Sequence, residues 1–203
     1  MAPPPAAAAA VDGVGVGVGA HSVFVYGSLM QDEVVRTIIK RVPPSSPALL
    51  PNYHRFNIKG RIYPAILPVQ SKKVAGKVCY TISLSFFWLL CSLFDSNCEL
   101  QILDEFEDVE YVRTRVEISL TDTSETMLAD TYVWADAEDP NLYGEWDFEE
   151  WKRLHMKDFL AMTHGFMDGL EQPESKSRVE TYQSFMQEIQ QPGTTTTTTQ
   201  VEI

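Results

Sequence analysis

The stretch HSVFVYGSLMQDEVVRTII, residues 21–39, changes character at its centre. Val23–Tyr26 is a short run of β-branched and aromatic residues, which predicts a buried strand. Gly27 and Ser28 interrupt this run, and the apolar residues then recur at helical spacing, which predicts an amphipathic helix. The apolar positions of that helix are Val34, Val35, Ile38 and Ile39. A strand is therefore joined to a helix by a very short turn of small residues.

The composition is that of a globular protein, with 44% hydrophobic and 22% charged residues in a chain of 203. It carries 28 Asp and Glu against 16 Lys and Arg, which gives a net charge of −12. An acidic surface repels the phosphates of nucleic acids and anionic membranes. We therefore expect neither nucleic acid nor a membrane surface as a partner.

The chain divides into a leader, a folded unit and a tail. Residues 1–20 are rich in Pro, Ala and Gly and lack the regions of a signal peptide, so we expect a disordered leader in a cytoplasmic protein. Residues 21–170 hold the packed pattern. Residues 171–203 are polar and include a run of six threonines, and we expect a largely disordered tail because little apolar area can be buried there.

Short strands outnumber helices in the folded unit. An amphipathic helix is predicted over 99–108, and a second, longer one over 147–166, where Asp147 and Glu150 have the spacing of a capping box. Strand-like runs lie at 53–60, 61–68, 73–78, 111–120 and 128–135. Because strands and helices do not alternate regularly, we predict an α+β domain in which a closed or strongly curved sheet is flanked by helices.

Residues 78–94 form a run of 17 uncharged residues. This length is near the lower limit for a helix that crosses a bilayer. A crossing here would separate two halves of one core, so we favour a buried or irregular segment, and a membrane-tethered protein is the alternative.

Carboxylates are the side chains best suited to chemistry. The four histidines lack the spacing of a metal site, and neither a P-loop nor a G-x-S-x-G motif is present. The run LDEFEDVEY, residues 103–111, holds five acids. On a helix, Glu107 lies at the border of the core face while Asp104 and Glu105 face outward. Glu107 is thus either a half-buried general base or part of a solvated helix end.

The motifs VFVYGSLM, GRIYPAILP, VAGKV, LDEFEDVEYVR and TYVW stand in the order and approximate spacing of the gamma-glutamylcyclotransferase superfamily. The chain resembles the plant avirulence-induced-gene branch of that superfamily over about residues 22–165. The resemblance implies a small mixed β-barrel with flanking helices. Residues 79–98 depart from it as an atypical apolar insertion.

The same resemblance implies a site and a reaction. Glu107 matches the general acid/base, and the substrate-binding loop matches Tyr26, Gly27, Ser28, Leu29 and Met30. The turn in this loop, with the start of the following helix, would present backbone N–H groups to a carboxylate or an oxyanion. The implied enzyme is a γ-glutamylcyclotransferase that releases 5-oxoproline from a small γ-glutamyl substrate and needs no metal or cofactor.

Some assignments have two readings. Tyr63, Tyr111 and Tyr132 either line the pocket or fill the core, and Arg61 or Arg113 either neutralises a substrate carboxylate or faces solvent. For the whole protein, the alternative to an enzyme is a barrel without catalytic activity that binds a small acidic metabolite or a protein partner.

Overall fold

The computed structural model describes residues 19–83, 99–170 and 178–190. Within these ranges, five strands pair in the order β3-β1-β5-β4-β2, and a further pairing of β2 with β3 closes the sheet into a barrel. β1 and β5 pair in parallel, whereas the other pairs in this ring are antiparallel. The strands are β1 (Gly19–Val25), β2 (Ser45–Ile58), β3 (Ala65–Ser83), β4 (Tyr111–Leu120), β5 (Thr126–Trp134) and the short β6 (Leu142–Tyr143), which pairs with β2. The expected α+β class and mixed barrel are confirmed.

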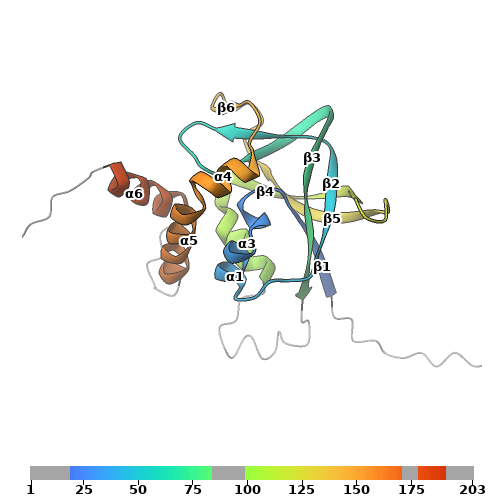
Figure 1. Ribbon diagram of the computed structural model, residues 1–203, viewed down its shortest axis with the longest axis horizontal. Coiled ribbons are helices and arrows are strands. Elements are labelled where there is room, and N and C mark those ends of the chain that lie inside the picture. Colours follow the sequence, from blue (N-terminus) through green and yellow to red (C-terminus); the bar gives the residue numbers. More distant parts are fainter. Residues whose placement is uncertain (1–18, 84–98, 171–177, 191–203) are drawn as a thin grey trace, which may run out of the picture.

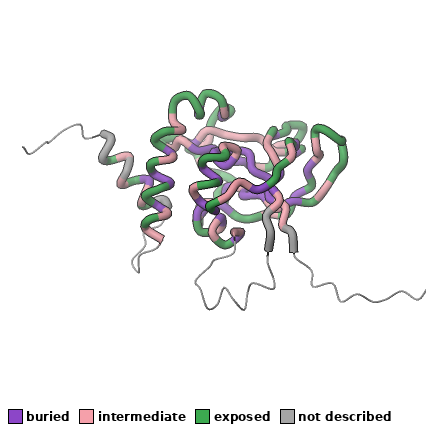
Figure 2. The backbone as a smooth tube through the Cα atoms, turned by 60° about the horizontal axis from the view of Figure 1, so that its bottom comes forward, coloured by how far each residue is buried: buried purple, intermediate pink, exposed green. Residues whose placement is uncertain are grey.

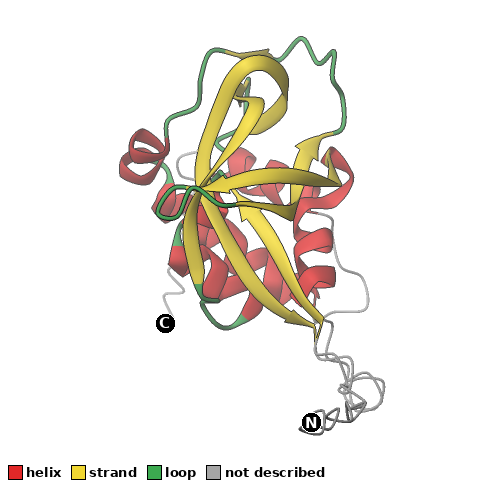
Figure 3. Cartoon of the chain, turned by 90° about the vertical axis from the view of Figure 1, so that its right-hand side faces the viewer, coloured by secondary structure: helices red, strands yellow, loops and turns green. Residues whose placement is uncertain are grey.

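The helices lie together on one side of the barrel, and a view from another side shows the strands in front of them (Figures 1 and 3). Two 3-10 helices, η1 (Ser28–Met30) and η2 (Asp108–Glu110), adjoin the helical layer. The α-helices are α1 (Asp32–Ile39), α3 (Glu99–Glu107), α4 (Phe148–Leu154), α5 (Met156–Leu170) and α6 (Arg178–Gln190).

Strand β1 separates two hydrophobic cores because its side chains alternate between the two faces of the sheet. Phe24 packs inside the barrel with strand residues such as Leu50 and Ile118. Val23 and Val25 face the helices, in a core that includes residues of α1, α3 and α5. Figure 2 shows these buried residues along the strands and on the adjoining helix faces. The opening strand therefore ends where barrel and helices meet.

The predicted helix over 147–166 is two helices, because His155 leaves helical geometry at φ −126° and ψ −14°. Residues 151 and 159 on a straight helix would be about 12 Å apart along its axis. The break instead brings the rings of Trp151 and Phe159 into edge-to-face contact at 5.5 Å. The apolar stripe was predicted correctly, but the single helix was wrong.

The prediction of a largely disordered tail over 171–203 is wrong for α6. Tyr182 is only 1% exposed, and its ring packs edge to face on Tyr63 at 5.4 Å. Its hydroxyl donates a hydrogen bond to the carbonyl of Gly60 at 3.3 Å. An aromatic residue in a polar segment thus buries enough area to fix a helix against the domain.

Two predicted boundaries also need correction. Residues 19 and 20, assigned to the leader, begin β1. Residues 79–83, assigned to the insertion, continue β3 and pair antiparallel with residues 19–23. The rest of the insertion, 84–98, lies outside the described residues. No helix in the described part of the chain has the length and apolar character needed to cross a membrane.

Candidate functional site

The site begins at the turn between β1 and α1. Gly27 has φ −118° and ψ −138°, and η1 starts directly after it. The N–H of Met30 donates to the carbonyl of Gly27 at 2.9 Å, and the N–H of Gln31 donates to the carbonyl of Ser28 at 3.0 Å. The N–H groups that precede Met30 have no acceptor inside such a short helix. The turn therefore carries backbone donors that an anion could use.

Gly27 is required by space and not by a left-handed backbone. A Cβ atom built on Gly27 would lie 2.7 Å from Cγ and 3.0 Å from Cδ of Pro64. The carbonyl of Pro64 is itself held, because the Tyr111 hydroxyl donates to it at 2.8 Å. The turn is thus pressed against a fixed wall of the site.

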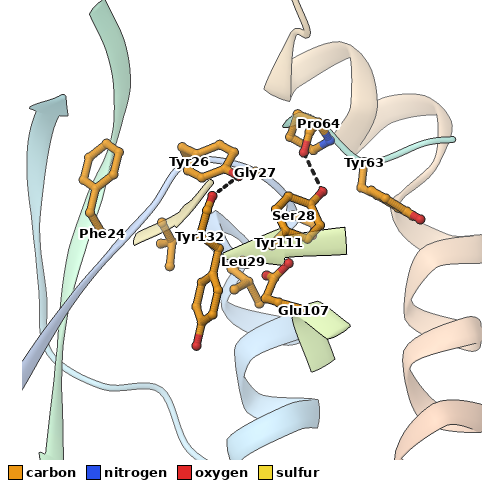
Figure 4. Close-up of a pocket in the computed structure, with 11 residues that line it drawn as sticks. Phe24, Tyr26, Gly27, Ser28, Leu29, Tyr63, Pro64, Glu107, Tyr111 and Tyr132 are labelled. Atoms are coloured by element: carbon orange, nitrogen blue, oxygen red, sulfur yellow. Dashed lines mark hydrogen bonds between the residues drawn. The ribbon is translucent and has the colours of Figure 1, made fainter. Parts of the chain in front are cut away.

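Glu107 is the last residue of α3. Leu100, Leu103 and Phe106 anchor one face of this helix in the core, and Glu107 is itself only 9% exposed. The carboxyl group of Glu107 points toward Tyr111 and the Ser28–Leu29 turn (Figure 4). The sheltered position expected for Glu107 is therefore present in the structure.

Glu107 and the turn line one pocket. Its enclosed part has room for roughly one ordered water molecule. The lining residues are Phe24, Val25, Tyr26, Gly27, Ser28, Leu29, Tyr63, Pro64, Glu107, Tyr111 and Tyr132. The set includes four of the five predicted loop residues. Met30 is the exception, since it packs against the hydrophobic core.

Hydroxyl groups hold the tyrosine walls of this pocket. Tyr26 donates to the carbonyl of Tyr132 at 2.6 Å, and Tyr63 donates to the carboxylate of Glu110 at 2.9 Å. Tyr63, Tyr111 and Tyr132 are buried and also line the pocket, so each of them is both a core residue and a pocket residue. The walls are consequently fixed to the strands and to η2.

Asp104 was expected to face outward, but it is partly buried behind the pocket. It accepts a hydrogen bond from Tyr132 at 2.8 Å and forms an ion pair with Arg113 at 3.2 Å. Burial, and then the hydrogen bond and negative charge of Asp104, raise the pKa of Tyr132 far above its ordinary value, with a further contribution from the charge of Glu107. The Tyr132 hydroxyl therefore stays protonated.

Neither arginine considered for a substrate carboxylate lines the pocket. Arg61 pairs with Glu110 at 3.0 Å and lies over the Tyr182 ring at 5.3 Å. Arg113 pairs with Asp104. Among the described lining residues there is no Lys or Arg, so the donors available to an anion include the backbone N–H groups of the turn and the Ser28 hydroxyl. No three His, Cys, Asp or Glu side chains of the described residues form a metal-binding group.

Pro64, Phe24 and Val25 belong to the lining but were not predicted as site residues. Pro64 follows Tyr63 in the motif GRIYPAILP, and its proline-induced bend was the available signal. Phe24 and Val25 gave no signal apart from strand propensity. Their position in the lining depends on where β1 ends.

The fold and the site together define a mixed β-barrel protein with a sheltered carboxyl beside a strand-to-helix turn. A sequence model described as "Gamma-glutamyl cyclotransferase, AIG2-like" matches residues 23–153. The chain therefore belongs to this family, and the predicted resemblance is confirmed.

Several relatives come from Arabidopsis thaliana. AIG2-like protein D is 54% identical over 157 residues, which cover 77% of this chain and 95% of the relative. AIG2-like protein C is 45% identical over 177 residues, which cover 87% of this chain and 95% of that relative. The solution structure of another Arabidopsis protein, 37% identical, matches with a TM-score of 0.53 over 80% of this chain and 90% of that one.

Proposed function

We propose that this protein is a cytoplasmic γ-glutamylcyclotransferase that converts a γ-glutamyl amine or γ-glutamyl amino acid into 5-oxoproline and a free amine. Family membership supports this type of reaction. The observation that carries the proposal is the shared pocket of the buried Glu107 carboxyl and the turn at Gly27–Leu29. This arrangement combines a proton acceptor with donors to a developing oxyanion.

The reaction closes a five-membered ring within one substrate molecule. The Glu107 carboxylate takes a proton from the α-ammonium group, and the resulting amine attacks the γ-carbonyl carbon. The carbonyl oxygen gains negative charge, which the backbone N–H groups of the turn stabilise. The C–N bond to the leaving amine then breaks as Glu107 protonates the departing nitrogen.

The second proton of the former ammonium group also ends on the departing amine, which leaves as its ammonium ion. Nucleophile and electrophile belong to one molecule, so the protein has only to fold the substrate back on itself and move protons. A γ-glutamyl group is larger than the enclosed part of the pocket, so the rest of the substrate would lie in the open part. No step in this sequence requires a metal or cofactor.

Glu107→Gln tests the proposal, with Glu105→Gln as the matched control because Glu105 is exposed on the same helix. The assay incubates each protein with γ-glutamyl dipeptides, glutathione and γ-glutamyl-ε-lysine and measures 5-oxoproline. We expect Glu107→Gln to lose about 100-fold or more of the activity, as for removal of a general acid/base, and Glu105→Gln to keep it.

Two results would count against the proposal. Activity that survives in folded Glu107→Gln excludes the assigned role of Glu107. Stabilisation of the wild-type protein by a γ-glutamyl compound without any 5-oxoproline indicates the alternative, a barrel that binds an acidic metabolite and does not turn it over.

A further inference from the structure

Arg55 of β2 lies behind the turn of the proposed active site. Its Nη1 donates at 2.6 Å to the carbonyl of Tyr26, the residue directly before Gly27. Its Nε donates to the carbonyl of Trp146 at 3.1 Å, and the guanidinium stands 5.1 Å from the centre of the Trp146 ring. The backbone N–H of Trp146 returns a hydrogen bond to the carbonyl of Arg55 at 3.1 Å. Arg55 thus connects the turn to the segment that leads into α4.

The charge of Arg55 is satisfied by carbonyl groups. Within the described residues, no carboxylate oxygen lies within 4.0 Å of it, and Glu145 and Asp147 act on it only from a longer range. Burial lowers the pKa of the half-buried guanidinium, which nevertheless stays charged at any physiological pH. A partly desolvated cation without a close carboxylate lowers the stability of the folded state, which suggests that its hydrogen bond to the Tyr26 carbonyl has a function.

Peptide geometry links this hydrogen bond to the donors of the turn. The Tyr26–Gly27 peptide is trans and planar, so the carbonyl that Arg55 holds and the N–H of Gly27 point in opposite directions. On the other side Pro64 leaves no room at Gly27, where an added Cβ would meet its ring at 2.7 Å. The Tyr26 side chain is also fixed, by its hydroxyl bond to the carbonyl of Tyr132. Rotation of this peptide is therefore opposed from both ends.

We infer that Arg55 is a positioning residue, which orients the Tyr26–Gly27 peptide and thereby sets the direction of the N–H groups from Gly27 to Leu29. This inference rests on the proposed function only for its catalytic consequence. The guanidinium does not line the pocket and acts through the backbone of the turn. Planarity matters here, because one fork donates to three carbonyl groups, those of Tyr26, Trp146 and, at 3.5 Å, Ala75, and also faces the Trp146 ring, which a lysine ammonium cannot do.

The test uses Arg55→Met, Arg55→Lys and a control, Arg115→Met, in the full chain. Arg115 lies in an exposed ion pair with Asp130, so its replacement removes the same charge with a much smaller loss of stability. Hydrogen exchange of the amides of Met30 and Gln31, which donate to the carbonyls of Gly27 and Ser28, is measured first, because it does not depend on turnover. We expect exchange there to quicken at least tenfold in Arg55→Met and less in Arg55→Lys, while the amides of β4 and β5 keep wild-type rates.

Kinetics gives the second readout. We expect kcat for 5-oxoproline release to fall about tenfold to a hundredfold in Arg55→Met with a much smaller change in KM, and Arg55→Lys to be intermediate. Arg115→Met should match the wild type. If Arg55→Met fails to fold, Arg55→Lys is judged by the same two measurements.

Two outcomes would overturn the inference. One is unchanged exchange at the amides of Met30 and Gln31 in the folded variants. The other is equal acceleration over the whole barrel, which would make Arg55 a residue of general stability. If the wild type shows no turnover, the proposed function fails, but the exchange result still decides the role of Arg55.

Discussion

Replacing Gly27 by alanine tests how tightly the turn is pressed against Pro64. The added Cβ would lie 2.7 Å from Pro64 Cγ, whereas carbon atoms in contact rest about 3.5–4.0 Å apart. The turn or the proline must therefore move by roughly 1 Å. The φ of Gly27, −118°, is not left-handed, and the penalty worked out here is that of the contact with Pro64. Overpacking of this kind costs about 1–3 kcal/mol.

The matched control is Gly165→Ala in α5, because nothing lies within 4 Å of a Cβ atom built there. Alanine in place of glycine inside a helix stabilises by about 0.5–1 kcal/mol. The two substitutions, identical in chemistry, should then differ by about 1.5–4 kcal/mol in free energy of unfolding. Urea unfolding followed by circular dichroism measures both. A Gly27→Ala protein as stable as Gly165→Ala would refute the close contact with Pro64.

Two further predictions concern the tail and the buried thiol. Tyr182→Ala removes the ring packed on Tyr63, so we expect α6 to detach and limited proteolysis after residue 170 to quicken. Tyr182→Phe loses only the 3.3 Å hydrogen bond to Gly60 and should be cleaved like the wild type. Equal cleavage of all three proteins would contradict the docking of α6. Burial raises the pKa of the Cys79 thiol to about 11 from 9.0, so the unfolded chain loses this proton first and stability falls as pH rises from 9.0 to about 11. By pH 10.5 the wild type should lose about 2 kcal/mol more than Cys79→Ala, and parallel pH profiles would show that the thiol is not sheltered.

Elements with a strong local signal were predicted well. The strand predicted at 111–120 is β4, and the predicted helix cap is present, since Asp147 accepts from the N–H of Glu150 at 2.7 Å. The prediction made β2 and β3 too short, because Pro47, Pro51 and Pro68 interrupt the strand pattern. The strands predicted at 61–68 and 73–78 are one strand, β3, although residues 61–64 precede it. A register shift after Pro51 lets the two strands keep pairing around this interruption.

The strand-turn-helix at residues 21–39 and the place of Glu107 at the edge of the core face of its helix were predictable, because both follow from spacing along a short segment. Three features were not predictable: the Glu107 carboxyl shares a pocket with Gly27–Leu29, Asp104 bonds to Tyr132, and Tyr182 packs on Tyr63. These contacts join residues far apart in the chain. The shared pocket exists because β1 pairs with both β3 and β5 as the barrel closes, and no local pattern specifies that pairing.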